Sequence, residues 1–223
     1  MQSYEATTGA DHEGSEGLSL IRGALMRIRI PRQQRSRERR LKIMEAARDL
    51  FARKGINGTS SNEIARQAGV SIGTFYSYFE NKKTLFLEIL REHLELFVTD
   101  IYSLQTDATI SLKDNIREHI RKAFKVFDLH PSFHKEALVL KFSDPEVKKL
   151  FDEVEQEQIL IISSLVEPYC HKRKPEDLQE VSKVIHSSVE NIAHAVKFLD
   201  SPMNKERLIE ELTEMLYQYV NSL

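Results

Sequence analysis

Residues 59–79 read TSSNEIARQAGVSIGTFYSYF, and this segment carries signals for two helix starts and a turn. Ser60 and Glu63 form a capping-box pattern, in which a hydroxyl and a carboxylate each satisfy a backbone N–H at the start of a helix. Gly69 can adopt the left-handed backbone angles of a tight turn, and Ser71 is placed to cap a second helix. The stretch therefore predicts two short helices joined by a tight turn. We place these helices at residues 63–67 and 71–78.

Small residues stand where the two helices would cross, so their backbones can approach closely. These residues are Ala65, Ala68 and Gly69. Val70 and Phe75 would form the apolar wedge between the helices. The outer face of the second helix then carries short hydroxyls, a glycine and a tyrosine: Ser71, Gly73, Thr74, Tyr76 and Ser77. Such a face can lie flat against a duplex and enter the major groove, with its first residues at the base edges.

The flanking segments are also helical. Ile43, Ala47, Leu50 and Phe51 fall on one face of a preceding helix, which we expect to end at Gly55. Asn81 is placed to cap a helix that runs from Lys82 to about Ser103. Further helices are expected at residues 111–129, 132–142, 145–170, 175–199 and 205–221. Glycine is absent after Gly73 and no long stretch alternates with period two, so hairpins are disfavoured.

The distribution of charge separates the chain into three parts. Residues 1–21 contain four acidic and no basic residues, residues 22–91 contain 16 Lys and Arg against six Asp and Glu, and residues 92–223 contain 16 against 24. A basic segment of net charge +10 attached to an acidic remainder is typical of a nucleic-acid-binding module joined to another domain. We expect an unstructured tail at residues 1–35, the DNA-binding domain at 36–81 and a second helical domain at 82–223.

Composition excludes several classes of protein. The one cysteine, Cys170, cannot form an intrachain disulfide, and no apolar run approaches the ~20 residues of a membrane span. The start of the chain has no signal-peptide layout, so a cytoplasmic protein is expected, and Met26 is an alternative start to Met1. No phosphate loop, HExxH pattern or nucleophile elbow is present, which argues against an enzyme. We expect no cofactor.

The full string resembles one known family. Ile64-Ala65-x-x-Ala68-Gly69-Val70-Ser71-x-Gly73-x-x-Tyr76-x-Tyr78-Phe79, followed by Lys82 and Leu85-Phe86, is similar to the DNA-binding domain of the tetracycline-repressor (TetR) family, as is Ala46-Ala47-x-x-Leu50-Phe51-x-x-Lys54-Gly55 before it. The resemblance covers about residues 38–90. It implies an all-α chain, with an N-terminal three-helix helix-turn-helix domain followed by a helical-bundle regulatory and dimerisation domain.

The resemblance also implies roles for individual residues. Ser61 would contact a backbone phosphate, as would Tyr76, Tyr78 and Lys82. Ser71, Ile72, Gly73 and Thr74 would lie toward the bases. The family often has histidine at the position of Tyr78, and Ile72 can read only a methyl group or groove shape. Direct base readout is therefore sparse, and phosphate contacts and DNA shape would carry much of the specificity. The basic stretch of residues 27–40 is either a DNA-contacting arm or a simple tail.

The same resemblance implies a homodimer on a palindromic operator, with a small-molecule effector bound in the second domain. Two apolar stripes near the C-terminus suit either a dimer interface or the internal core. They consist of Val181, Val184, Ile185, Ser188, Val189, Ile192, Ala193 and Val196, and of Leu208, Leu212, Met215, Leu216 and Tyr219. Repression is the function that the family implies.

The effector pocket has a weaker signal, because an aromatic stripe at helical spacing suits a plain core as well as a pocket. The candidates are Phe97, Ile101, Phe124, Phe127, Phe133, Leu138, Phe142 and Asn191, with His134, His186 and His194 as further polar lining. His186 and His194 are eight residues apart and make no tight metal pair. Glu153, Glu155 and Glu157 are interpreted as a solvated helix face, so no metal site is expected.

Two other functions remain open from the sequence. The chain could be an architectural or nucleoid-associated DNA-binding factor that a protein partner controls, without a small effector. It could also be an enzyme on a helical scaffold, although no motif supports this. A ligand screen separates the first alternative from an effector-controlled repressor, and turnover of a substrate would support the second.

Overall fold

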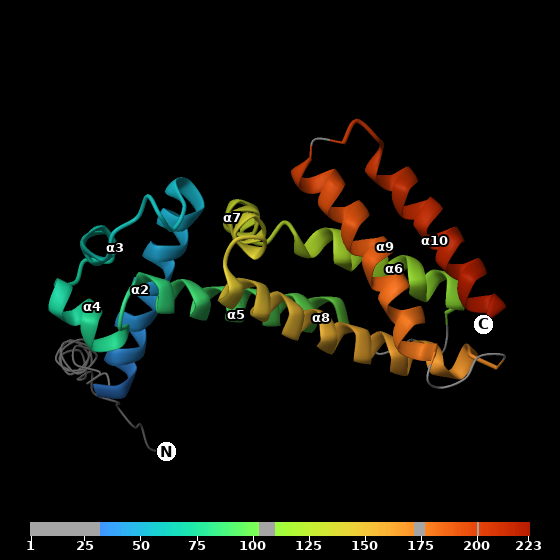
Figure 1. The fold of residues 1–223 in the computed structure, drawn as a ribbon, viewed down its shortest axis with the longest axis horizontal. Helices are drawn as coiled ribbons and strands as arrows, with labels where there is room; N and C mark the ends of the chain where they lie inside the picture. The colour runs from blue at the N-terminus through green and yellow to red at the C-terminus, as the bar shows by residue number, and fades with distance from the viewer. Residues whose placement is uncertain (1–31, 103–109, 172–176, 200) are drawn as a thin grey trace, which may run out of the picture. The chain divides into compact units, whose positions relative to one another are not determined.

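The structure is a computed structural model that describes residues 32–102, 110–171, 177–199 and 201–223. Figure 1 shows that the described part consists of helices and their connections. In chain order they are α2 (Arg32–Lys54), α3 (Ser61–Gln67), α4 (Ile72–Tyr78), α5 (Lys82–Tyr102), α6 (Leu112–Val126), α7 (Pro131–Lys141), α8 (Pro145–Val166), the 3-10 turn η1 (Glu167–Tyr169), α9 (Leu178–Phe198) and α10 (Lys205–Ser222). The all-α expectation is confirmed for these residues.

Helix starts follow local capping chemistry. The side chains of Ser60, Ser71, Ser111, Asp144 and Asn204 each accept a backbone N–H from the first turn of the helix that follows. These bonds satisfy N–H groups that have no partner within the helix. The positions of most helix starts could therefore be predicted from short sequence patterns.

Several predicted boundaries were wrong. The first helix begins at Arg32 rather than near Ser36, so four residues of the expected tail are helical, while residues 1–31 lie outside the described part. The long helix α8 ends at Val166 instead of reaching Cys170, because Pro168 interrupts it and the chain continues as the 3-10 turn η1. The predicted start at Pro175 also lies outside the described residues, and α9 begins at Leu178.

The first hydrophobic core holds the helix-turn-helix together. Phe51 of α2 and Phe86 of α5 make an edge-to-face ring contact at 5.4 Å, and Phe75 of α4 is fully buried beside them. Phe133 of α7 also packs on Phe86, with ring centroids 5.4 Å apart. The core therefore extends past residue 82, where the sequence analysis placed a domain boundary; that boundary stays a prediction.

The second core lies where α6, α9 and α10 pack together and against the C-terminal half of α5. It includes Phe97 of α5, Phe124 of α6, Ala193 of α9 and Leu212 of α10. Helix α8 packs along both α5 and α9, as Figure 1 shows. None of the helices in the described residues is long and apolar enough to cross a membrane.

Candidate nucleic-acid interface and effector cavity

The turn between α3 and α4 has the predicted geometry. Gly69 has φ of +68°, a left-handed conformation that side chains rarely adopt. The N–H of Val70 donates to the carbonyl of Ala65 at 3.0 Å and closes the turn. The Glu63 N–H donates to Ser60 Oγ at 3.2 Å, and the Glu63 carboxylate pairs with Lys54. The predicted Ser60 cap is confirmed, and Lys54 ties the start of α3 to α2.

Helix α4 divides cleanly into an inner and an outer face. Phe75 is fully buried, whereas Tyr76 is 56% exposed and Ile72 is 37% exposed. Gly73 is also exposed, and a Cβ added there would meet only the Ser71 hydroxyl, at 3.9 Å. Packing within the protein therefore does not require a glycine at this position. The arrangement leaves a flat surface on which a partner can approach the backbone closely.

The short hydroxyls on this face already bond to one another. Ser71 Oγ and Thr74 Oγ1 are 2.9 Å apart, and Ser71 Oγ also accepts the Thr74 N–H at 3.1 Å. Ser77 Oγ donates to the Thr74 carbonyl at 2.7 Å. A hydroxyl has one donor and two acceptor positions, so each retains some capacity for a ligand. These bonds fix the rotamers of the side chains that were predicted to face the bases.

Three of the predicted phosphate contacts surround one shallow polar hollow. Ser61, Tyr76 and Lys82 come from α3, α4 and α5, and all three line it. Asn57, Asn62 and Asn81 also line the hollow, and the sequence analysis did not assign them to the interface. Asn62 and Asn81 lie at helix starts and Asn57 lies in the loop after α2, which is the only signal that the sequence offers for them. One carboxylate, that of Glu63, also lines the hollow, and it pairs with Lys54. The hydroxyl, amide and ammonium donors outnumber it, so the hollow suits a phosphate group.

Lys82 makes two hydrogen bonds to backbone carbonyls that the sequence did not predict. Its ammonium donates to the carbonyls of Ile56 and Thr59 at 2.7 and 2.6 Å, and so ties the loop after α2 to the start of α5. Two of its three N–H donors are used in this way, which leaves one for a ligand. Tyr78 is half-buried against the first core. The phosphate contacts of Lys82 and Tyr78 stay predictions.

A separate cavity of about 170 Å³ lies among α5, α6, α7, α8, α9 and α10. Its lining is mainly apolar. Of the eight residues predicted for a pocket, Phe97, Ile101 and Phe127 line it, and of the further polar candidates, His134 and His186 do.

The other five pocket candidates lie elsewhere. Phe133 and Leu138 pack in the first core, because α7 turns that face toward the helix-turn-helix. Phe124 is buried in the second core, and Phe142 is 90% exposed just after α7 ends. Asn191 is exposed, and its amide donates to the Ser187 carbonyl at 2.7 Å. Helical spacing shows which residues share a face but not what that face contacts.

Buried histidines form the polar side of this region. His134 Nδ1 lies 3.2 Å from His93 Nε2, and His134 Nε2 lies 3.4 Å from His194 Nε2. Burial lowers the pKa of His93 to about 3 and holds the pKa of His134 well below its ordinary value. These rings are therefore neutral at pH 7. His93 comes next to an apolar run on α5, and no sequence pattern marks it as a member of this cluster.

Family models match two parts of the chain. Residues 43–89 match the model for bacterial regulatory proteins of the tetR family, and residues 111–219 match a tetracyclin repressor-like C-terminal domain. The HTH-type transcriptional regulator YuxN of Bacillus subtilis is 30% identical over 146 residues, which is 62% of this chain and 48% of that protein. An HTH-type regulator of Staphylococcus aureus is 32% identical over 72 residues, or 32% of this chain and 39% of its own length. The chain thus spans less than half the length of these relatives.

Solved structures share the fold. A TetR-family regulator of Syntrophomonas wolfei has a TM-score of 0.65 at 21% identity, covering 82% of this chain and 95% of that one. The fatty acid degradation regulator FadR of Bacillus halodurans has a TM-score of 0.61 at 21% identity, covering 79% and 93%. Together with the family models, these matches account for both the helix-turn-helix and the C-terminal helices.

Proposed function

The chain belongs to the TetR family of DNA-binding transcriptional regulators, which are not enzymes, and we propose that it is a repressor released from DNA by a small apolar effector. The observation that carries this proposal is the largely apolar cavity of about 170 Å³ in the C-terminal helices. A DNA-binding module alone needs no such space, because protein interiors are otherwise close-packed.

The DNA contacts follow from the exposed face of α4 and the hollow beside it. Ser61, Tyr76 and Lys82 would hold one phosphate at the hollow, and Tyr78 would contact another. Base readout would come from the first turn of α4, at Ser71, Ile72, Gly73 and Thr74. Because two of these residues carry no polar side chain, few hydrogen bonds to base edges are available, and groove shape supplies the remaining specificity.

The cavity sets limits on the effector. A cavity of roughly 150 Å³ lined by aliphatic and aromatic side chains is large enough for benzene, so the cavity of about 170 Å³ seen here would have to widen for a longer molecule. Widening would move α5, α6 or α8, which surround the space. FadR of Bacillus halodurans is described as a fatty acid degradation regulator, so acyl chains are the first class to test.

Dimerisation through α9 and α10 is part of the same proposal. Val184 on α9 and Met215 on α10 are 50% and 47% exposed, although both belong to the predicted apolar stripes. A dimer would bury these side chains, and a palindromic operator requires a two-fold symmetric protein. Val184→Glu with Met215→Glu should give monomers in sedimentation velocity and weaken binding to a palindromic site. Dimers of unchanged stability would contradict this interface.

The test of effector control combines binding with stability. The DNA upstream of the protein's own gene is labelled, and fluorescence anisotropy follows its release in the presence of a library of apolar molecules. An effector at about 100 times its dissociation constant should also stabilise the protein by about 2.7 kcal/mol, which a thermal shift detects. If no compound releases DNA or shifts the melting temperature, the effector proposal fails, and control of a DNA-binding architectural factor by a protein partner is favoured. Under either function, the protein would act in the cytoplasm, where bacterial DNA lies.

A further inference from the structure

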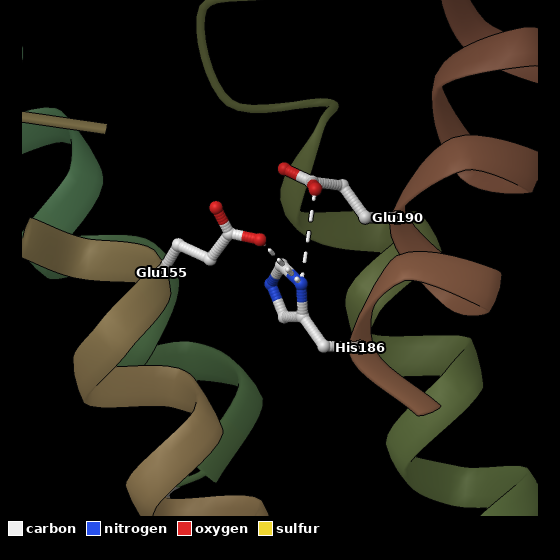
Figure 2. A group of neighbouring side chains, drawn as sticks. All are labelled: Glu155, His186 and Glu190. Atoms are coloured by element: carbon white, nitrogen blue, oxygen red, sulfur yellow. Dashed lines mark ion pairs between the residues drawn. The ribbon is translucent and has the colours of Figure 1, made fainter. Parts of the chain in front are cut away.

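Three side chains from two helices meet in the wall of the cavity. Glu155 projects from α8, and His186 and Glu190 project from neighbouring turns of α9, as Figure 2 shows. The two residues on α9 are four positions apart, so they share one face of the helix. One ligand atom of each of the three residues lies within 4.8 Å of the others. All three residues line the cavity.

The imidazole of His186 is buried and only partly satisfied. His186 is 7% exposed, and its Nε2 lies 2.8 Å from Gln158 Oε1. Its Nδ1 is buried without a hydrogen-bond partner. This nitrogen points toward the two carboxylates, 3.7 Å from Glu155 Oε1 and 3.8 Å from Glu190 Oε2. A buried polar atom without a partner is costly, so its orientation calls for a ligand.

The bond to Gln158 determines what this ligand must be. An amide oxygen at Nε2 requires the proton there, because only an N–H can donate to it. Nδ1 then presents a lone pair, and it faces two carboxylates that are also acceptors. Three electron-pair donors thus face one location, and a cation bound there would satisfy all three.

We propose that Glu155, His186 and Glu190 bind a divalent first-row transition-metal ion, such as Zn²⁺, in the wall of the cavity. Two ligand atoms that each lie about 2.1 Å from one ion can be up to about 4.2 Å apart, so the separations of 3.7 and 3.8 Å from His186 suit a shared ion. The two carboxylate oxygens lie within 4.8 Å of each other, and a small side-chain rotation brings them into the same range. One imidazole with two carboxylates suits Zn²⁺, Fe²⁺ or Mn²⁺, whereas Mg²⁺ and Ca²⁺ prefer oxygen ligands alone. Gln158 would orient the histidine, as outer-shell hydrogen bonds do in metal sites.

Lys183 competes with the proposed ion for Glu155, and this competition can be tested. Its ammonium pairs with Glu155 Oε1, the same oxygen that faces His186. The metal would compete with this ion pair or use the other carboxylate oxygen. Lys183 is half-exposed and is not a ligand, so its removal should tighten metal binding. Three protein ligands would also leave at least one coordination position for water or an effector.

The experiment uses the full-length protein after chelator treatment and titrates Zn²⁺, Co²⁺ and Mg²⁺ by calorimetry and visible absorption. We expect one Zn²⁺ per chain, visible absorption from bound Co²⁺, and no comparable affinity for Mg²⁺. His186→Gln should weaken Zn²⁺ binding at least 100-fold, and Lys183→Met should strengthen it several-fold. His171→Gln, at an exposed histidine outside the cluster, should change nothing.

Glu190→Gln keeps the proposal testable if the buried histidine variant does not fold. It should weaken Zn²⁺ binding at least 10-fold while melting like the wild-type protein without metal. Equal Zn²⁺ affinity in wild type and either ligand variant would overturn the proposal, as would loss of Zn²⁺ binding in His171→Gln. The measurement uses no DNA and no effector, so its failure leaves the proposed repressor function standing, and the reverse also holds.

Discussion

The first core and the cavity region are built differently. In the first core, Phe51, Phe75 and Phe86 are fully buried and contact one another or their neighbours closely. The cavity region keeps about 170 Å³ of space and buries polar groups such as His134, Gln158 and His186. Close packing presents the α4 surface rigidly, whereas space and buried polar groups reduce stability but allow a ligand to bind. DNA binding therefore requires a closely packed support for α4, whereas effector binding requires space and buried polar groups.

The largest expected effect is the loss of stability when a phenylalanine is replaced by alanine, in the first core or beside the cavity. Phe75→Ala should destabilise the protein by about 4 kcal/mol, within the usual range for buried phenylalanine. Phe97→Ala should cost less, about 3 kcal/mol, because this ring borders the cavity and already lacks neighbours on one side. Urea denaturation of both variants measures the difference. Equal losses would show that the cavity does not loosen the packing around Phe97.

Acid should weaken the histidine-rich region next. The pKa of His93 is about 3 when folded against an ordinary value of 6.5, so the unfolded chain binds more protons between these values. Stability is therefore full above pH 6.5 and falls as pH decreases toward 3, by up to about 1.4 kcal/mol per pH unit for this group. His134, whose pKa burial also lowers, adds to the slope.

Chemical denaturation between pH 5 and pH 8 checks this prediction. His93→Gln, which keeps a polar side chain without the titration, should flatten the pH dependence. The same slope in that variant would mean that other groups cause the loss of stability.

Changes in side-chain volume should act in opposite directions in the two regions. Val189→Leu adds a methylene group beside the cavity and should stabilise the protein by about 0.5–1 kcal/mol while reducing the effector response. Ala47→Leu adds volume to the close-packed first core and should destabilise it by about 1–3 kcal/mol. Thermal melts measure the stability change of each variant. Destabilisation of both would indicate that the cavity has no room for the added methylene group.

Gly73→Ala separates folding from recognition on α4. A methyl group fits there, and alanine favours a helix by up to about 1 kcal/mol over glycine, so the fold should be slightly more stable. The same methyl group would hold the helix away from DNA and weaken operator binding. Melting temperature and DNA affinity are measured on the same preparation. Unchanged affinity would show that DNA does not approach the backbone at Gly73.

The sequence predicted the first core better than the cavity for a physical reason. The helix-turn-helix depends on local signals: the Ser60 and Ser71 caps, the left-handed Gly69 and a core of closely spaced residues. These signals act within about ten residues, so a single stretch displays them. Even so, the bonds of Lys82 to the carbonyls of Ile56 and Thr59 could not be foreseen, since they depend on how a loop folds back.

The cavity is formed by residues far apart in the chain. Its lining combines α5 with α8 and α9, and no periodicity shows which faces meet. Phe142 and Phe97 looked alike in the sequence, yet Phe142 is 90% exposed and Phe97 is buried. Glu155 and His186 are also far apart in the sequence. The sequence therefore indicates a solvated Glu155, whereas the structure places it beside the buried imidazole of His186.

Binding of the Tyr76→Ala variant to DNA tests whether the exposed face of α4 is the DNA-binding surface. The wild-type protein and the variant are titrated onto the DNA upstream of the protein's own gene at several salt concentrations, with Phe142→Ala, at an exposed ring outside α4, α9 and α10, as the control. We expect the wild-type affinity to fall linearly with salt on logarithmic axes, because phosphate contacts release counterions. Tyr76→Ala should bind about 10-fold more weakly while dimerisation and melting stay unchanged. Equal affinity of Tyr76→Ala and wild type, or an affinity that does not depend on salt, would contradict the assignment of α4 and the hollow beside it as the DNA-binding surface.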